Sequence, residues 1–219
     1  MTLLILATAF AGFSRSYYLR PWFFPTPLSA LLRWHGILFT SWLVLLLVQT
    51  ALVAAGRTRL HRRLGVAGAV MALAILAMGT YTAIVSAREA IEAGGGSQPL
   101  SFLVVPLGDM LLFAGLIGGG LHYRKRVDVH KRLILLGCIS MLPAAIGRLP
   151  LDILSGGQPV VYALLDLYLV PCVIHDLIAL RRVHPATGWG SLAIVASQPL
   201  RLMLANTGAW LAFAGWLVR

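Results

Sequence analysis

Long apolar stretches without a charged residue recur along this chain. Ile37 to Gly56 and Val66 to Ser86 contain no Asp, Glu, Lys or Arg, and about 20 such residues make a helix long enough to cross the hydrocarbon of a bilayer. Residues 14–27, with their aromatics, arginines and prolines, predict an interfacial connection. The whole pattern predicts helices near residues 28–55, 63–87, 99–121, 132–149, 159–181 and 190–217.

The two terminal segments have the weakest span signal. Residues 1–18 begin with MTLLILATAFAG, which is short for a full crossing and lacks the basic n-region of a secretory signal. A tilted span, an interfacial helix and a signal peptide are the alternatives for it. Residues 190–217 are interrupted by Pro199, Arg201 and Asn206, so they form either a kinked span or an interfacial helix with a short apolar tail. We therefore expect six or seven spans.

Composition supports the same class. Hydrophobic residues make up 59% of the 219 residues and charged residues 11%, whereas soluble domains carry about 25% charged residues. The expected fold is an all-α, polytopic transmembrane helix bundle that forms a single domain over residues 1–219. Gly115 and Gly119 have the GxxxG spacing typical of close helix packing. HExxH, paired CxxC, GxSxG and Walker A patterns do not occur in a suitable context, which gives no support to hydrolase or nucleotide-binding activity.

The net charge of +11 is concentrated in three short connections. Residues 57–63, 124–132 and 181–184 hold eleven of the eighteen Lys and Arg residues. By the positive-inside rule these connections face the cytoplasm of a multi-pass protein of the plasma (inner) membrane. Because the basic residues alternate with spans, we expect the lipid bilayer and anionic lipid headgroups as their partners, and not nucleic acid.

Ionisable and polar side chains inside apolar segments are the first functional candidates, because they are costly in lipid. We expect an intramembrane polar cluster made of His35, Gln49, Asp109, Arg148 and Asp166. Within it, Arg148 is expected to pair with Asp109 or Asp166. The cluster is either structural or the site of a proton-coupled transporter, since carboxylates at membrane depth often change protonation with occupancy.

A second group consists of histidines near the cytoplasmic ends of the expected helices. The candidate cofactor ligands are His61, His122, His130 and His175, and His184 lies at the same side. Two imidazoles on facing helices can hold one b-type haem, and neutral imidazole is also a common metal ligand. The alternative is that histidines beside Arg and Lys contact lipid headgroups. Cys138 and Cys172 lie in apolar segments and suggest neither a disulfide framework nor a zinc site.

Three stretches carry a family resemblance. WHGILFTSWLVLLLVQT, RLHRRLG and DVHKRLILLGCISMLPAAIGRL resemble an uncharacterised family of bacterial multi-pass membrane proteins, over roughly residues 28–150. The resemblance implies recurring positions that correspond here to His35, Gln49, His61, Gly65, His130 and Arg132. The chain also resembles haem-bearing bundles of the cytochrome b and ferric-reductase type. Those bundles place histidine pairs at two depths, whereas the outer half of this chain offers only His35.

These observations leave three functional hypotheses from different classes. The first is a redox-type protein that binds b-type haem or a metal through the cytoplasmic-side histidines and exchanges electrons with quinone. The second is a proton-coupled transporter or permease that uses Asp109, Asp166 and Arg148. The third is a non-catalytic assembly subunit beside a membrane partner, in which the polar residues serve packing alone.

The distribution of basic residues predicts the topology. Single cysteines introduced near Arg59, Lys125 and Arg182 should be protected from an impermeant thiol reagent added to intact cells, whereas cysteines near Gly95 and Gly157 should be labelled. Labelling of the basic connections from outside would reverse the orientation.

Overall fold

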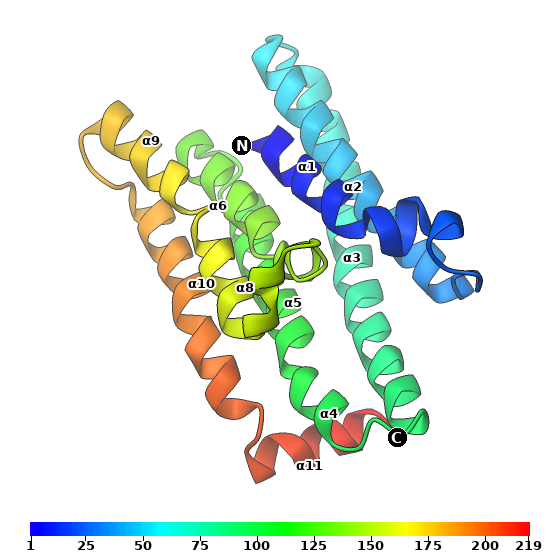
Figure 1. Cartoon of the computed structure of the whole chain (residues 1–219). Helices are drawn as coiled ribbons and strands as arrows, with labels where there is room; N and C mark the ends of the chain where they lie inside the picture. Colours follow the sequence, from blue (N-terminus) through cyan, green and yellow to red (C-terminus); the bar gives the residue numbers. More distant parts are fainter.

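The computed structural model describes all 219 residues as helices and their connections, with no strand. The longer helices pack side by side, and the chain ends beside α4 (Figure 1). In chain order the elements are α1 Thr2–Phe13, η1 Ser14–Tyr18, η2 Arg20–Trp22, α2 Ala30–Ala54, α3 Thr58–Glu92, α4 Gln98–Phe102, α5 Val104–His122, α6 Val127–Ile139, α7 Pro143–Ile146, η3 Asp152–Gly156, α8 Gln158–Asp166, α9 Val170–Leu180, α10 Pro185–Leu204 and α11 Gly208–Leu217.

Five helical segments are long and apolar enough to cross a membrane. They are Ala30–Ala54, Thr58–Glu92, Gln98–His122, Val127–Ile146 and Gln158–Leu180. Each corresponds to one of the predicted helices, so the all-helical class is confirmed, together with five helices long and apolar enough to span a membrane. The connections at residues 55–57, 123–126 and 181–184 lie together at one end of the bundle (Figure 1). We call it the basic end, because most residues of the predicted basic connections lie there.

The terminal segments differ from simple spans. Residues 1–18 form the twelve-residue helix α1 followed by the π-helical turn η1, so α1 is about 18 Å long at 1.5 Å per residue. Residues 190–217 are divided at 205–207 into α10 and α11. Helix α11 lies across the end of the bundle opposite the basic end (Figure 1). The indole Nε1 of Trp210 donates to the carbonyl oxygen of Leu100 at 2.9 Å and fixes α11 on α4.

Helix boundaries follow from local chemistry. Ser29 and Thr207 cap α2 and α11, because their hydroxyl oxygens accept from the backbone N–H groups three residues later. Gly56 and Gly94 follow the last turns of α2 and α3 with positive φ values of 70° and 90°. Glycine is favoured at such left-handed positions because it has no Cβ.

The surface distribution of apolar residues is that of a bundle in lipid. Large hydrophobic side chains stay exposed along the helices; Leu73, Leu111, Ile178 and Met203, for example, are each more than two-thirds exposed. Such extensive apolar exposure is unusual for a soluble monomer and expected for a protein surrounded by acyl chains.

Small residues let the helices approach closely. A Cβ on Gly120 would lie 2.9 Å from Ile134, and one on Gly137 would lie 2.6 Å from Ile117, so both glycines are needed where α5 packs on α6. The predicted packing role also holds for Gly119, which faces Leu133. It does not hold for Gly115, which faces open space.

The contact between α1 and α7 predicts a stability effect. A Cβ added at Gly12 would lie 2.1 Å from the carbonyl oxygen of Ala145, so Gly12→Val should force the two helices apart and cost about 1–3 kcal/mol. Gly118→Val is the matched control, because nothing lies within 4 Å of its added Cβ. Thermal unfolding of the purified variants compares them, and equal melting temperatures would contradict the close contact.

Candidate functional site

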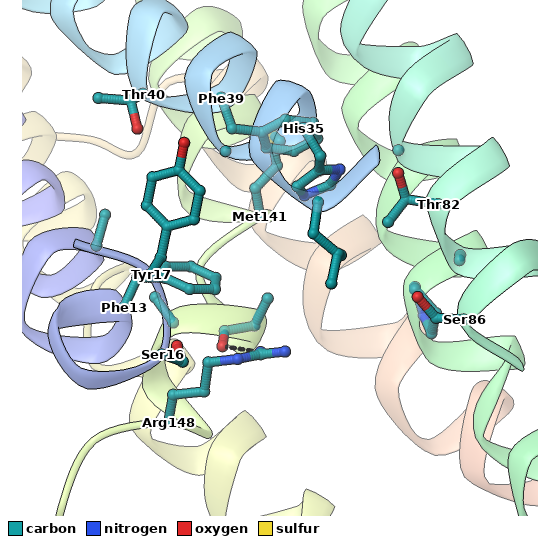
Figure 2. A pocket seen from close by; sticks show the side chains of 18 of the residues that line it. Phe13, Ser16, Tyr17, His35, Phe39, Thr40, Thr82, Ser86, Met141 and Arg148 are labelled. Carbon is teal, nitrogen blue, oxygen red and sulfur yellow. Dashed lines mark hydrogen bonds between the residues drawn. The ribbon is translucent and has the colours of Figure 1, made fainter. Parts of the chain in front are cut away.

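A cavity of about 570 Å³ lies between α1, η1, α2, α3, α6 and the start of α5. We call it the main cavity. Its lining includes Tyr17 on η1, His35 on α2, Thr82 on α3 and Arg148 just after α7. Figure 2 shows these side chains facing a common space from different elements. All the contributing segments belong to the half of the bundle away from the basic end.

Polar side chains are scattered through a mostly apolar lining. On α2 the lining contains Trp42, then His35 about two helical turns away and Leu32 beyond it. On α3 Thr82 and Ser86 stand among small residues. On the α6–α7 segment the lining runs from Cys138 to Arg148, which brings a charged group to the end away from the basic connections.

Small side chains create the space. Gly79, Ala83, Ala87 and Ala90 follow one another on α3 and all line the main cavity. Their spacing of three or four residues places them on one helix face. A second close approach occurs at Gly36 on α2, where an added Cβ would lie 2.1 Å from the ring of Tyr17. The Tyr17 hydroxyl donates to the carbonyl oxygen of Arg33 at 3.0 Å, which holds η1 against α2 beside the main cavity.

Several polar atoms in the lining have no hydrogen-bond partner. They are Ser16 Oγ, His35 Nδ1, Thr82 Oγ1 and Trp42 Nε1, and all four are inaccessible or nearly so. The His35 ring stacks on Phe39, with ring centroids 4.1 Å apart, which fixes its orientation. A buried polar atom without a partner costs about 1–3 kcal/mol. Because these atoms expose almost no surface, even toward the main cavity, a ligand can bond to them only when neighbouring side chains move.

Arg148 brings a positive charge to the same place. Its Nη1 donates to the carbonyl oxygen of Ala144 at 2.6 Å, and its guanidinium carbon lies 4.9 Å from the ring centroid of Phe13. The Arg148 side chain is exposed, and its guanidinium keeps its proton, as arginine does in proteins. No carboxylate lies within ion-pair distance of it. In Figure 2 the guanidinium projects into the space between η1 and the α3 residues Thr82 and Ser86.

The other arginine of the lining is already bound. Arg20 donates through Nε to the Thr26 carbonyl oxygen at 2.9 Å and through Nη1 to the Ser16 carbonyl oxygen at 3.4 Å. Its guanidinium also lies over the ring of Phe24. Arg20 thus holds the 14–27 connection together, and Arg148 keeps the available donors.

The predicted pairing of Arg148 with Asp109 or Asp166 is wrong. Asp109 on α5 accepts from Arg201 Nη1 at 2.5 Å, and both side chains are buried. Asp166 on α8 accepts from Gln198 Nε2 at 2.7 Å. Both partners lie on α10, in the segment that the sequence left undecided between a span and an interfacial helix. Helix α10 therefore supplies the polar partners of α5 and α8.

The five residues of the predicted polar cluster divide among three places. His35 and Arg148 line the main cavity, whereas Asp109 and Asp166 face α10. Gln49 lies near the basic end, because it is in the second half of α2. With its amide oriented to satisfy both ends, its nitrogen donates to His61 Nδ1 at 2.6 Å and its oxygen accepts from the Gly65 N–H at 3.0 Å.

Of the four candidate haem ligands, His61 and His130 come together. Their ring centroids are 6.3 Å apart and the rings are nearly perpendicular. His122 packs against Tyr123, and the side chain of His175 is 65% exposed. His130 Nδ1 lies 2.7 Å from the carbonyl oxygen of Gly120 and therefore carries a proton.

The tautomers bear on the haem hypothesis. His61 Nδ1 accepts from Gln49, so its proton is on Nε2, and a protonated nitrogen cannot ligate iron. No group of three or more His, Cys, Asp and Glu side chains is arranged to hold a metal ion. His130 donates through Nδ1 to a backbone carbonyl, the arrangement common in metal-ligating histidines, and keeps a lone pair on Nε2. Haem binding stays a prediction from sequence.

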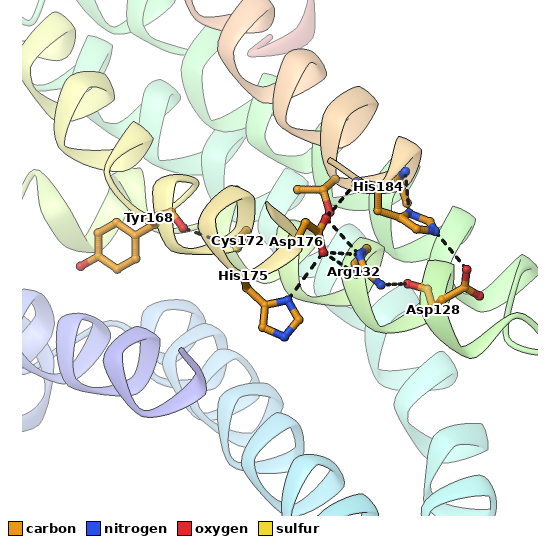
Figure 3. Close-up of polar contacts among 9 residues, drawn as sticks. Asp128, Arg132, Tyr168, Cys172, His175, Asp176 and His184 are labelled. Atoms are coloured by element: carbon orange, nitrogen blue, oxygen red, sulfur yellow. Dashed lines mark hydrogen bonds and ion pairs between the residues drawn. The ribbon is translucent and has the colours of Figure 1, made fainter. Parts of the chain in front are cut away.

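A buried ion pair closes the basic end. Asp176 on α9 accepts from Arg132 Nε at 3.0 Å and makes a further contact with Arg132 Nη2. The hydroxyl of Thr187 donates to the other oxygen of Asp176. His184 caps α10 and bonds through Nε2 to Asp128 at 3.0 Å. Figure 3 shows how these groups tie α6, α9 and α10 together, with His175 at their edge.

Sequence reasoning found part of the site. It singled out His35 and Arg148, but it missed Ser16, Tyr17 and Thr82, because a single hydroxyl in an apolar run is usually unremarkable. The α3 pattern of Gly79, Ala83 and Ala87 was the available signal, since a small-residue face leaves either a close contact or a void. Comparisons with family models, curated proteins and solved structures give no match to the chain.

The Asp109–Arg201 pair predicts a double-mutant effect. Arg201→Gln should destabilise the detergent-extracted protein by about 3–5 kcal/mol, because a buried carboxylate loses its counter-ion. Asp109→Asn in the same chain should restore part of that loss, as measured by thermal unfolding. The matched control combines Asp109→Asn with Arg148→Gln. If Asp109→Asn restores stability to the Arg148→Gln variant and not to the Arg201→Gln variant, the partner of Asp109 is Arg148.

Proposed function

We propose that this protein is an integral membrane protein that binds a lipid-like small molecule in the main cavity. The apolar part of the ligand lies against Trp42, Leu43 and Cys138, and its polar head lies near His35 and Arg148. The observation that carries the proposal is a mostly apolar cavity lining that contains a few polar side chains, among them His35, Thr82 and Arg148.

The size of the main cavity supports this role. Binding sites for small molecules usually enclose about 300–1,000 Å³ and combine an apolar lining with a few polar groups. At about 570 Å³ the main cavity falls within that range. Its lining also reaches Leu28, Gln98 and Phe102 at the helix ends, so a molecule dissolved in the bilayer has a short route from the interface.

The unpaired groups give the ligand a reason to bind. Ser16 Oγ, His35 Nδ1 and Thr82 Oγ1 have lost water without gaining a protein partner. A ligand head that bonds to them recovers part of that cost. The positive-inside rule favours a cytoplasmic basic end, and we propose that the polar end of the main cavity faces the opposite side of the plasma membrane.

The hypotheses drawn from the sequence agree with the proposed binding site to different degrees. Quinone belongs to the proposed class of ligand, because it combines an apolar body with a polar head. The transporter hypothesis loses its ion triad, because Arg201 and Gln198 bind the two carboxylates. Neither a catalytic step nor a partner subunit is required for the proposed binding.

Photolabelling tests the proposal. The protein is placed in lipid nanodiscs with a long-chain fatty acid or the corresponding alcohol, each carrying a diazirine near the middle of its chain. We expect peptide mapping by mass spectrometry to find labels at Trp42, Leu43 or Cys138. Excess unlabelled amphiphile should remove these labels but leave the general labelling of lipid-facing residues.

Two variants of α3 give the control. Ala83→Phe fills the main cavity and should abolish the displaceable labels, whereas Ala77→Phe adds the same ring on the exposed face and should not. Melting temperatures confirm that both variants are folded. Absence of displaceable labelling by both probes in the parent protein would overturn the proposed function.

A further inference from the structure

The charged groups around the main cavity distinguish between kinds of ligand head. The lining contains the basic residues Arg20 and Arg148 and the imidazole of His35, but no Asp or Glu. The two buried arginines of the chain have carboxylate partners, Asp176 for Arg132 and Asp109 for Arg201, whereas Arg148 is exposed at the edge of the main cavity. Arg148 has a backbone carbonyl and an aromatic ring only.

We propose that the ligand is a single-chain amphiphile with an oxyanion head, and that Arg148 is its counter-ion. This inference rests on the proposed function, because it names the class of molecule that occupies the main cavity. An exposed guanidinium at the edge of an apolar cavity is accessible to an anionic head group, and hydrogen bonds between two opposite charges are stronger than those between neutral groups. The ligand supplies the negative group that the protein omits.

The donors of Arg148 suit a carboxylate or a phosphate. One of its terminal nitrogens is used by Ala144, which leaves Nε and Nη2 on one edge of the planar guanidinium. Two parallel N–H groups of this kind bind two oxygens of one head group. A neutral quinone carbonyl would accept one hydrogen bond and leave the arginine charge uncompensated.

Neutral groups complete the head site. His35 and Thr82 lie on two helices across the main cavity from the 14–27 connection, and Ser16 lies on η1 beside Arg148 (Figure 2). Each has an unpartnered polar atom. A small movement of the neighbouring side chains would bring these atoms within reach of an oxyanion, while Phe39, Met141 and Trp42 line the space for its chain.

The volume of the main cavity suits a single-chain molecule. A site of about 570 Å³ matches one molecule of drug-like size, and the main cavity is partly open to the surroundings of the bundle. A long-chain carboxylic acid or an alkyl phosphate therefore fits the charge and the volume together.

Competition for photolabelling tests this inference. With the diazirine alcohol as probe, at alkaline pH, the competitors are oleate, methyl oleate, oleyl phosphate and a short-chain ubiquinone. Oleate should compete at least about tenfold more strongly than methyl oleate, because hydrogen bonds to a charged group are worth about 1.5–3 kcal/mol and 1.4 kcal/mol corresponds to tenfold. The relative strength of competition by oleyl phosphate and by oleate distinguishes a phosphate head from a carboxylate head.

Variants locate the charge effect. Arg148→Gln should abolish the preference for oleate over its ester while the neutral probe still labels, and Arg148→Lys should keep part of the preference. Arg33→Gln, which removes an exposed arginine outside the main cavity, should leave it unchanged. Labelling of Arg148→Gln by the neutral probe shows that the variant is folded.

The outcomes separate this inference from the proposed function. Equal competition by oleate and methyl oleate in the parent would refute an oxyanion ligand while leaving the lipid-like site intact. Stronger competition by ubiquinone than by oleate would replace the oxyanion with a neutral quinone. Failure of every probe to label Trp42, Leu43 or Cys138 would refute the proposed function itself.

Discussion

A charged side chain inside an apolar helix bundle needs a partner, because acyl chains and apolar side chains solvate it poorly. Arg132 and Arg201 obey this constraint through buried Asp176 and Asp109. These pairs join α6 to α9 and α5 to α10, so they also determine which helices are neighbours. Arg148 lies exposed at the edge of the main cavity and has no carboxylate partner. The difference between the paired arginines and the unpaired one separates structural charges from a charge available to a ligand.

The shape of the main cavity depends on a second constraint, which is close packing. Helices without large side chains at their contact normally close up, as α1 and α7 do at Gly12 and Ala145. On α3 the small face closes at Gly79, where an added Cβ would lie 2.4 Å from the Met110 sulfur, but it stays open at Ala83 beside the segment that Tyr17 holds against α2. A space lined by small residues therefore persists beside unpaired polar atoms.

The hydropathy pattern predicted the membrane class and the five long apolar segments, because burial in lipid is encoded locally by about 20 residues at a time. It also pointed to His35 and Arg148 as unusual. It did not identify Arg201 as the partner of Asp109, because helix neighbours depend on packing between segments 92 positions apart. Arg201 and Pro199 instead made residues 190–217 look interrupted. Gln49 was placed in the wrong cluster for a related reason: its partner His61 begins the next helix, and the depth of Gln49 in α2 brings it to the basic end.

Native mass spectrometry of protein extracted gently from its own membrane tests the central claim most directly. The account predicts that the parent chain carries one small amphiphile, and that Ala83→Phe, folded to the same extent, has lost it while Ala77→Phe retains it. A parent chain without any such molecule, or an Ala83→Phe chain that carries as much as the parent, would contradict a ligand site in the main cavity.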